Sequence, residues 1–534
     1  MIITFTHGFD RHQQGVNGAS LRRGKHIRVG QHRGARRQNQ TFGVDAGLAQ
    51  AALAAASVRD DTIGAELVAA ALHRDPGAHA RLALGLQMLA PPEGLSPEAW
   101  RVVSLAVLMV TWWVTEAIPI SATALLPLAA LPLAGAASIK DAASPYADQI
   151  VFLFIGGFML AACVERWRLH ERIALSIASA AGGRPAALVA GFMIASALIS
   201  MWISNTATTL MLAPIAIGAA RALSPDGKPD LALGGALALG VAHAATIGGI
   251  GTPVGTPTNL IAIAFFERAG EPIAFIDWMA RAIPLMLLML PLAWLFLCLP
   301  LFVRKAHARF DAIGAVVKGA LKALGPTTRP EIRIGIVFAL VALAWMLRTL
   351  LVDLPGLGGL TDTGIAIIGA LSLFLVPSGR GGGEKLIDWP TAERIPWGIA
   401  ILFGGGLSLA AAMEATGLAA WIGAWIAGLG GISALALVAL LVITTILISE
   451  LASNVATLTS MLPVVAAVAA ATDTPLQQLA FPVALAASFA FMLPVATAPN
   501  AIAYSSGLVS LKRMLAVGFG LNIAAAVLII AFAA

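Results

Sequence analysis

Two short polar motifs interrupt long apolar segments of this chain at the same spacing from each other. Ser200 and Ser204-Asn205-Thr206 in the first half return 249 residues later as Ser449 and Ser453-Asn454-Val455. Polar residues inside a membrane cost free energy unless something satisfies them. Paired interruptions at corresponding places in two halves therefore indicate the binding site of a secondary transporter.

A helix that is broken inside a membrane can bind an anion and a cation side by side. The free backbone N–H groups and partial positive charge at a half-helix N-terminus favour a carboxylate. The unwound carbonyl oxygens on the other side of the break can hold a small, hard cation. Each ion would neutralise the field that the other feels, and this is the physical basis of cotransport.

A second pair of segments follows the Ser-Asn motifs. Gly255-Thr256-Pro257-Thr258-Asn259 matches Ala496-Thr497-Ala498-Pro499-Asn500 at an offset of 241. Proline withholds an N–H group and resists helix continuation, while glycine tolerates unusual backbone angles. We expect a non-helical carbonyl from each segment to complete a cation site, although each segment alone is also compatible with an ordinary proline-kinked membrane helix.

The duplication extends to two glycine-rich runs. Residues 153–165 and 402–414 are identical at eight of 13 positions, again at an offset of 249. These runs are short, so the sequence predicts two re-entrant hairpins in two inverted structural repeats. The expected pieces are hairpins at about 148–165 and 397–414, and broken helices at about 186–222 and 431–471.

Composition places the chain in a membrane. Hydrophobic residues make up 58% and charged residues 12%, against about 25% charged residues in soluble domains. Recurrent apolar runs predict an all-α polytopic membrane protein with about ten or eleven transmembrane helices. No Gly-x4-Gly-Lys-Ser/Thr phosphate loop occurs, so an ion gradient is the expected energy source rather than ATP.

Charge divides the chain into four parts. Residues 1–44 carry eight Lys or Arg and one Asp, and the whole chain has a net charge of +6. The positive net charge of the chain therefore comes from this tail. This tail fits a disordered basic arm, an Arg-rich targeting-like segment or sequence upstream of the true start. The basic stretch 304–333 is expected to be a cytoplasmic, interfacial linker. The expected organisation is an extension at 1–90, a first half at 91–303, this linker, and a second half at 334–534.

Other classes of function fit the sequence less well. Glu450 stands beside the second motif and is the candidate proton carrier, whereas Glu116, Glu165 and Glu414 suit packing or interfacial roles. No His-Glu-x-x-His motif suggests a membrane-embedded hydrolase. Paired half-helix sites suit occlusion better than the free flow of a channel. We therefore expect no enzymatic activity and no nucleic-acid partner.

These motifs together resemble the divalent anion:sodium symporter family. The resemblance covers about residues 91–534 and includes Trp112-Trp113-Val-Thr115-Glu116-Ala117-Ile118-Pro119, the glycine-rich runs and both pairs of polar motifs. It implies a scaffold domain, a transport domain, a homodimer and elevator-type alternating access. It also implies two sodium sites as the coupling-ion sites and no organic cofactor.

The resemblance assigns roles to individual residues. The first sodium site would use Ser200, Ser204, Asn205 and Gly255, and the second Ser449, Ala452, Asn454 and Ala496. The substrate carboxylates would contact Ser204, Asn205, Thr206, Ser453, Asn454 and Val455, with Thr256 and Thr497 close by.

Two departures from the family pattern affect these expectations. Val455 replaces the threonine of many bacterial relatives, so one carboxylate must rely on backbone N–H groups or on Asn454. The segment 74–86, where the family has its first membrane helix, is too short and too charged to span a bilayer.

The sequence thus predicts a sodium-coupled importer of small dicarboxylates such as succinate, malate or fumarate. A sodium-independent exchanger of dicarboxylates or tricarboxylates and a sulfate transporter remain alternatives on the same scaffold. The expected location is the inner, plasma membrane of a bacterium, with the lipid bilayer and a second copy of the chain as partners.

Overall fold

The computed structural model describes residues 75–180, 184–222, 231–303, 311–427, 433–472 and 474–533. Across these ranges the regular structure is helical, with an isolated β-bridge between Pro377 and Lys385. The prediction of an all-α fold is therefore confirmed. The predicted basic tail 1–44 lies outside the described residues, as do the remainder of the extension up to residue 74 and the start of the linker at 304–310.

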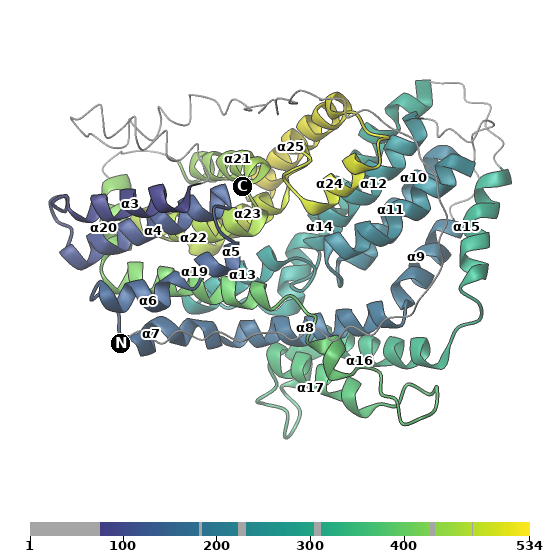
Figure 1. The fold of residues 1–534 in the computed structure, drawn as a ribbon, viewed down its shortest axis with the longest axis horizontal. Coiled ribbons are helices and arrows are strands. Elements are labelled where there is room, and N and C mark those ends of the chain that lie inside the picture. The colour runs from purple at the N-terminus through teal and green to yellow at the C-terminus, as the bar shows by residue number, and fades with distance from the viewer. Residues whose placement is uncertain are drawn as a thin grey trace, which may run out of the picture. The chain divides into compact units, whose positions relative to one another are not determined.

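The extension and the first half supply the elements up to α14, the predicted linker contains α15, and the second half begins within α16 (Figure 1). The early helices are α3 (Pro76–Gln87), α4 (Pro97–Thr115), α5 (Ile120–Thr123), α6 (Leu126–Leu133), α7 (Ile139–Ala143), α8 (Gln149–Arg166) and α9 (Leu169–Ala180). They are followed by α10 (Pro185–Ser200), α11 (Asn205–Ala222), α12 (Leu231–Gly249), α13 (Pro257–Arg268) and α14 (Phe275–Val303).

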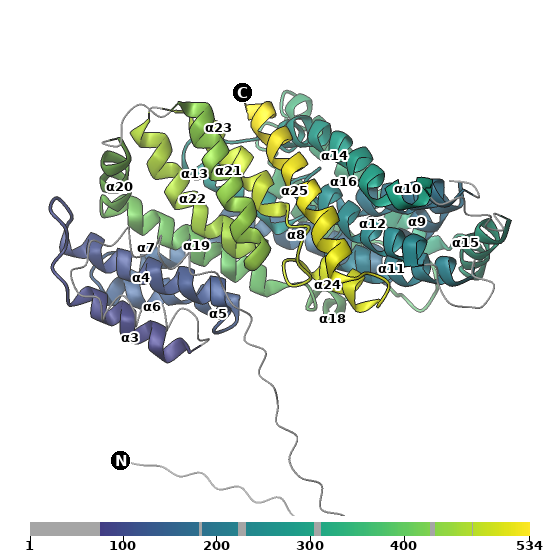
Figure 2. The ribbon, with the colours of Figure 1, turned by 90° about the horizontal axis from the view of Figure 1, so that it is seen from above.

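The second half repeats, from α19 onward, the order of long and short helices that begins at α8 in the first half. The linker helix α15 (Asp311–Ala323) is followed by α16 (Arg329–Leu351), α17 (Asp362–Leu375), α18 (Trp389–Ala392), α19 (Trp397–Ala415) and α20 (Leu418–Ala427). The second half continues with α21 (Ala434–Leu451), α22 (Asn454–Ala471), α23 (Leu476–Ser488), α24 (Ala498–Ser505) and α25 (Leu511–Ala533). In Figure 2 the yellow helix α25 lies between α21 and α14, and it packs on both.

Helix length and surface composition mark an integral membrane protein. Within the described ranges, eight helices are long and apolar enough to cross a bilayer, and four further apolar helices are shorter. On α16 the exposed large side chains share one face, at Ile332, Ile336, Leu340, Leu343, Leu347 and Leu350. Such a stripe would aggregate in water but suits contact with lipid. By contrast, α12 is 89% buried and forms the centre of the packing.

The chain reverses direction at the first Ser-Asn motif. Ser200 at the end of α10 donates a hydrogen bond to the Ala245 carbonyl near the end of α12, at 2.7 Å. Earlier in both helices, Met193 lies against Gly240, so α10 runs parallel to α12. The side chain of Asn205, which begins α11, lies against Gly249 at the same end. Since α11 also packs along α12, it runs back, and α10 and α11 form a helical hairpin.

The second motif lies at the tip of an equivalent hairpin. Ser449 near the end of α21 donates to the Ala487 carbonyl near the end of α23, at 2.6 Å. Asn454, the first residue of α22, donates to the Ser488 carbonyl at 3.3 Å. Both α21 and α22 pack along α23. The segments predicted as broken helices at 186–222 and 431–471 are therefore hairpins whose halves are antiparallel.

The hairpins predicted at about 148–165 and 397–414 were wrong in position. Both runs lie in single, continuous helices, α8 and α19. Their glycines allow close helix contact, because a Cβ at Gly156 would lie 2.7 Å from the Ala366 backbone in α17. A Cβ at Gly405 would lie equally close to Ala124. Small residues at helix interfaces let backbones approach in this way, so glycine here indicates packing and not a reversal.

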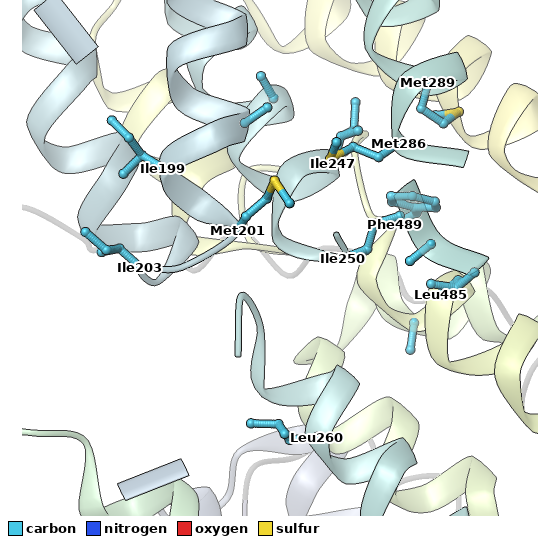
Figure 3. Packing of buried hydrophobic residues seen from close by; sticks show 14 of the residues in the cluster. Ile199, Met201, Ile203, Ile247, Ile250, Leu260, Met286, Met289, Leu485 and Phe489 are labelled. Atoms are coloured by element: carbon cyan, nitrogen blue, oxygen red, sulfur yellow. The ribbon is translucent and has the colours of Figure 1, made fainter. Parts of the chain in front are cut away.

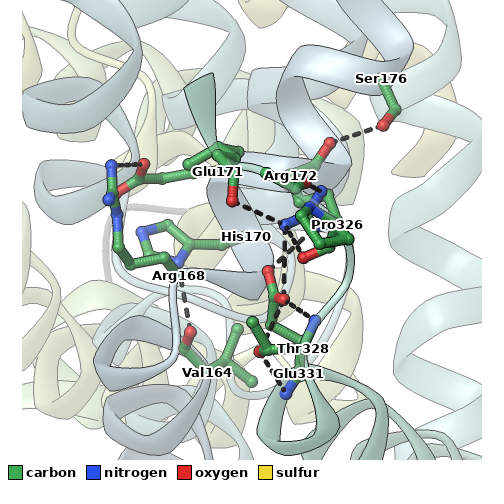
Figure 4. Close-up of polar contacts among 11 residues, drawn as sticks. Val164, Arg168, His170, Glu171, Arg172, Ser176, Pro326, Thr328 and Glu331 are labelled. Carbon is green, nitrogen blue, oxygen red and sulfur yellow. Dashed lines mark hydrogen bonds and ion pairs between the residues drawn. The ribbon is translucent and has the colours of Figure 1, made fainter. Parts of the chain in front are cut away.

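An ion-pair network fastens α9 to the start of α16 (Figure 4). The Arg172 guanidinium in α9 donates to Glu331 Oε1 at 2.8 Å and to the Gly325 carbonyl at 3.0 Å. Glu331 also completes a capping box with Thr328 at the N-terminus of α16. The part of the predicted linker that is described, from Asp311 onward, thus forms α15 and a loop held by α9.

The N-terminal end of the described chain is a short helix. The 12 residues of α3 pack against α4, where Trp100 donates to the Leu86 carbonyl at 3.0 Å. Such a helix is too short to span a bilayer, as the sequence predicts for 74–86. Buried side chains of α4, α6 and α19, among them Trp113, Leu131 and Leu402, form a hydrophobic cluster separate from the main one around α12.

Candidate functional site

Backbone oxygens converge on Gly255 at the tip of the first hairpin. A Cβ at this glycine would lie 2.9 Å from the carbonyl oxygens of both Ser200 and Met201, and it would also meet the carbonyl of Gly249. Only glycine leaves the chain room to approach so closely. Carbonyls from unwound segments at such a point are the ligands that transporters use for sodium.

Asn205 adds a side-chain oxygen to this group. It is the first residue of α11, and its amide lies against the Cα of Gly249. Its Oδ1 is buried and has no hydrogen-bond partner. A buried polar atom without a partner costs about 1–3 kcal/mol. Such an atom beside several carbonyl oxygens fits a cation ligand.

Aliphatic side chains enclose the hairpin tip (Figure 3). Ile199, Met201 and Ile203 come from the tip, and Ile247 and Ile250 come from the end of α12; all are at most 6% exposed. This apolar surround excludes water from one side of the polar group. Electrostatic interactions inside it are stronger than in water.

Asn259 shapes the loop between α12 and α13. Its Nδ2 donates to the Gly249 carbonyl at 2.9 Å and to the Thr252 carbonyl at 2.7 Å. Trp278 in α14 donates from Nε1 to the Ile250 carbonyl at 2.9 Å. These bonds hold residues 250–256 in a non-helical turn that presents Gly255 to the hairpin tip.

Asn500 does the same work in the second repeat. Its Nδ2 donates to the Ala490 carbonyl at 2.9 Å and to the Leu493 carbonyl at 3.0 Å. The sequence separations, ten and seven residues, match those of Asn259. The turn ends at Ala496, which is buried, and at Thr497, whose Oγ1 caps α24 by accepting from Asn500 N at 3.2 Å.

The second hairpin tip differs from the first in one respect. Ser449 Oγ donates to Asn454 Oδ1 at 2.9 Å, so this amide oxygen has a partner. Ala452 at the tip is extended and buried. A cation bound here would share Asn454 with Ser449 or replace that hydrogen bond.

The N-termini of α11 and α22 have backbone N–H groups that suit an anion. At α11, Ser204 is exposed and its Oγ accepts from Ala207 N at 3.2 Å, while Thr206 is half-buried. At α22, Ser453 makes no side-chain cap, so the first N–H groups of this helix lack that partner. Val455 lies in this first turn and offers its backbone N–H where a threonine would add a hydroxyl.

Several buried polar atoms at the repeated motifs lack a hydrogen-bond partner. Besides Asn205 Oδ1, the side-chain oxygens of two equivalent pairs lack partners, and these are Thr208 with Thr457 and Asn259 with Asn500. Buried polar groups are nearly always hydrogen-bonded, so each exception requires an explanation. At the motifs, bound ligands would supply such partners.

Glu450, near the end of α21, binds the loop 489–497 through its carboxylate. Its carboxylate is 4% exposed and accepts hydrogen bonds from the backbone N–H groups of Phe491, Met492 and Leu493 at 2.7–3.0 Å. Asn522 in α25 donates to it as well, at 2.7 Å. Four donors thus hold this carboxylate against the loop 489–497 and the helix α25. This arrangement suits an anchor for the loop.

The hairpin tip also contacts α16 through aromatic rings. Trp202 is stacked with Phe275 and Trp345 at centroid distances of 6.2 and 6.5 Å, and it meets Phe338 edge-on at 5.1 Å. Phe338 and Trp345 belong to α16. The first hairpin is therefore seated against a helix outside the repeated motifs.

Neutral oxygens are the available ligands for a cation at these loops. Within the described ranges, no three His, Cys, Asp or Glu side chains gather as a metal site would require. His243 is fully buried beside Phe491, with ring centroids 5.1 Å apart, and is a packing residue. Carbonyl, amide and hydroxyl oxygens suit an alkali cation better than a transition metal.

Comparison with known proteins identifies the family. The sequence model of the sodium:sulfate symporter transmembrane region matches residues 79–534. The chain belongs to this family. Its members are the divalent anion:sodium symporters, so the resemblance drawn from the sequence motifs is confirmed.

Several relatives of this symporter carry a functional name. A sodium-dependent dicarboxylate transporter, SdcS, of Staphylococcus saprophyticus is 36% identical over 454 residues, which cover 83% of this chain and 87% of the relative. The protein of the same name from Staphylococcus aureus is 37% identical over 448 residues, covering 82% and 86%. Among solved structures, the Alcanivorax borkumensis YdaH transporter, which has an unusual topology, is similar with a TM-score of 0.55. It is 15% identical and covers 81% of this chain and 97% of its own, so this likeness concerns the fold alone.

The structure of this chain places most of the predicted site residues at the two hairpin tips. Ser200, Ser204, Asn205 and Thr206 lie at the first tip, where the carbonyls of Ser200 and Met201 approach Gly255, and Thr256 follows Gly255. Ser449, Ala452, Ser453, Asn454 and Val455 lie at the second tip, whereas Ala496 and Thr497 end the loop that Glu450 and Asn500 hold. Sequence reasoning missed Thr208 and Thr457 as candidate ligands, although they keep the offset of 249. It also missed Ser488, which carries no motif.

Proposed function

We propose that this chain is a sodium-coupled importer of small dicarboxylates such as succinate, malate and fumarate. The observation that carries the proposal is the group of carbonyl oxygens around Gly255 with the unpartnered Oδ1 of Asn205 beside it. This group adjoins the N-terminus of α11, where a carboxylate would be favoured. The names of the staphylococcal relatives support both the sodium and the dicarboxylate.

The two ions would strengthen each other's binding. A sodium ion between Ser200, Asn205 and Gly255 would order the first hairpin tip, and a second between Ser449, Ala452, Asn454 and Ala496 would order the other. The substrate carboxylates would then meet the first turns of α11 and α22, at Ser204, Asn205, Thr206, Ser453, Asn454 and Val455. Thr256 and Thr497 would border the substrate as the N-caps of α13 and α24.

We also propose that transport uses an elevator movement within a homodimer in a bacterial plasma membrane. Support comes from the family resemblance and from the packing. The hairpins pack along α12 and α23, whereas α4, α6 and α19 contribute most of a second hydrophobic cluster, which Ala456 of α22 joins. The first group would be the moving transport domain, and the second would belong to the scaffold.

Uptake into proteoliposomes tests the proposal. Radiolabelled succinate should accumulate above equilibrium under an inward sodium gradient and should not under an equal potassium gradient. Sodium-independent uptake that requires internal dicarboxylate would instead indicate an exchanger. Stronger competition by sulfate than by unlabelled succinate would contradict the dicarboxylate assignment.

Two serines on α10 give a matched pair for the sodium site. Ser196 and Ser200 are both fully buried, and each donates to a carbonyl of α12 at 2.7 Å. Ser200→Ala should raise the sodium concentration for half-maximal uptake roughly tenfold or more. Ser196→Ala should leave it nearly unchanged, because Ser196 lies one turn away from the hairpin tip. Equal effects of both substitutions would contradict the assignment of Ser200 as a sodium ligand.

A further inference from the structure

One side-chain hydrogen bond joins the two ligand-bearing loops across the repeats. Thr258 Oγ1 and Ser488 Oγ lie 2.7 Å apart, and both side chains are at most 1% exposed. Thr258 stands in the first turn of α13, directly after the loop 250–256. Ser488 ends α23, directly before the loop 489–497. The bond therefore ties the end of one loop to the beginning of the other.

Polar contacts continue from this bond toward both sites. On one side, Thr258 Oγ1 lies 3.3 Å from Thr256 Oγ1, next to Gly255. On the other side, the Ser488 carbonyl accepts from Asn454 Nδ2 at 3.3 Å. Because the amide of Asn454 is planar, a partner on Nδ2 also sets the direction of Oδ1, the atom assigned to the second cation. A shift of Ser488 would thus re-aim that ligand.

The positions that correspond to Thr258 and Ser488 in the duplicated segments cannot form an equivalent bond. At the offset of 241 that relates the two loops, Thr258 corresponds to Pro499 and Ser488 corresponds to Ile247. Neither of these side chains can donate or accept a hydrogen bond. The helices around them nevertheless pack in both places, α13 on α23 and α12 on α24. The Thr258–Ser488 bond is therefore an addition to the shared packing and not a by-product of duplication.

We propose that Thr258 and Ser488 are positioning residues that couple the two cation sites. This inference rests on the proposed function, because it assumes that both loops bind sodium. A cation that orders the loop 250–256 fixes the start of α13, and the buried bond passes this order to Ser488 and Asn454. The second site then loses less conformational entropy when it binds its cation, because its ligands are already partly ordered. By reciprocity, the second cation strengthens the first to the same extent.

Hydrogen exchange of the full-length protein in nanodiscs tests this coupling. Sodium chloride replaces choline chloride at constant ionic strength, without substrate, and protection is followed in peptides that cover 249–256 and 489–497. In the unmodified protein both loops should gain protection with sodium. In Thr258→Val and in Ser488→Ala, the sodium midpoints of both loops should rise, by about threefold, because removal of a reciprocal coupling weakens both sites. The double variant should match the single ones, because they remove the same bond.

Thr246→Val is the matched control. Thr246 is a buried threonine of the same repeat, and its Oγ1 donates to the Ala242 carbonyl within its own helix at 3.2 Å. Both midpoints should stay unchanged in this variant. If they are also unchanged in Ser488→Ala and Thr258→Val, the coupling is overturned while the proposed function stands. If sodium protects neither loop of the unmodified protein, both the coupling and the proposed function are overturned.

Discussion

At the residue scale, Glu450 shows how a buried charge can serve the site without binding a ligand. Its carboxylate accepts hydrogen bonds from three consecutive backbone N–H groups of the loop 489–497 and from Asn522. Such a group contributes through the loop conformation that it imposes. The sequence places Glu450 beside the second motif but contains no sign of these donors, since they lie 41 to 72 residues away.

Replacement of the Glu450 carboxylate should destabilise the loop 489–497 and leave the pH dependence of uptake unchanged. In Glu450→Gln, the new NH2 group would face N–H donors, so we expect a loss of about 1–3 kcal/mol in unfolding free energy. Uptake should fall with an unchanged pH profile. Thermal unfolding in detergent would measure the change in stability. Uptake measured between about pH 5.5 and about pH 8.5 would give the pH profile.

Glu414→Gln provides the control for this experiment, because Glu414 is exposed at the end of α19. It should change neither stability nor uptake. A stable Glu450→Gln protein whose uptake loses its dependence on pH would show that Glu450 carries protons after all.

The candidate ligands themselves were largely predictable at this scale. Ser200, Asn205, Ser449 and Asn454 stand out because polar residues recur at a fixed offset in apolar sequence. The partner of Thr258 could not be predicted, because Ser488 belongs to an unrelated stretch and meets Thr258 only after the two repeats pack together. A bond between residues 230 apart leaves no local pattern.

At the element scale, glycine content was ambiguous in a way that only packing resolves. A short, glycine-rich apolar run fits either a reversal of the chain or a helix that touches its neighbour closely. In α8 the second holds, since Gly156 lies directly against the backbone of Ala366. The reversals occur instead at 201–204 and at Ala452–Ser453, where Ser and Asn suit helix starts.

Alanine substitutions distinguish a packing glycine from an incidental one. Gly156→Ala should lower the unfolding free energy by about 1–3 kcal/mol, because the added Cβ must displace backbone atoms of α17. Gly218 in α11 has open space where its Cβ would be, so Gly218→Ala should be neutral or stabilise by about 0.5–1 kcal/mol. Thermal unfolding of both variants in the same detergent would measure the difference. Equal stability of the two would contradict the close packing of α8 on α17.

At the scale of the whole molecule, composition and periodicity were sufficient to predict a polytopic helical protein. The number of crossings was harder to predict, because helices such as α17 and α23 have 14 and 13 residues and fall below the length of a full span. The seating of α9 on the loop before α16 was not predictable either. It depends on Arg172 and Glu331, which are 159 residues apart and carry no motif.

Trp202 has a consequence for how this protein can be observed. The indole at the first hairpin tip rests on Phe275, Phe338 and Trp345. If the hairpin moves past α16 during transport, Trp202 must leave this aromatic surface and enter a different surround. The wavelength and the intensity of its fluorescence emission would then change. The protein would therefore contain an intrinsic reporter of each movement of the hairpin. Sodium and succinate together should shift the emission of the unmodified protein, and Trp202→Phe should remove most of that shift; an equal shift in the variant would mean that the hairpin stays on α16 while substrate moves.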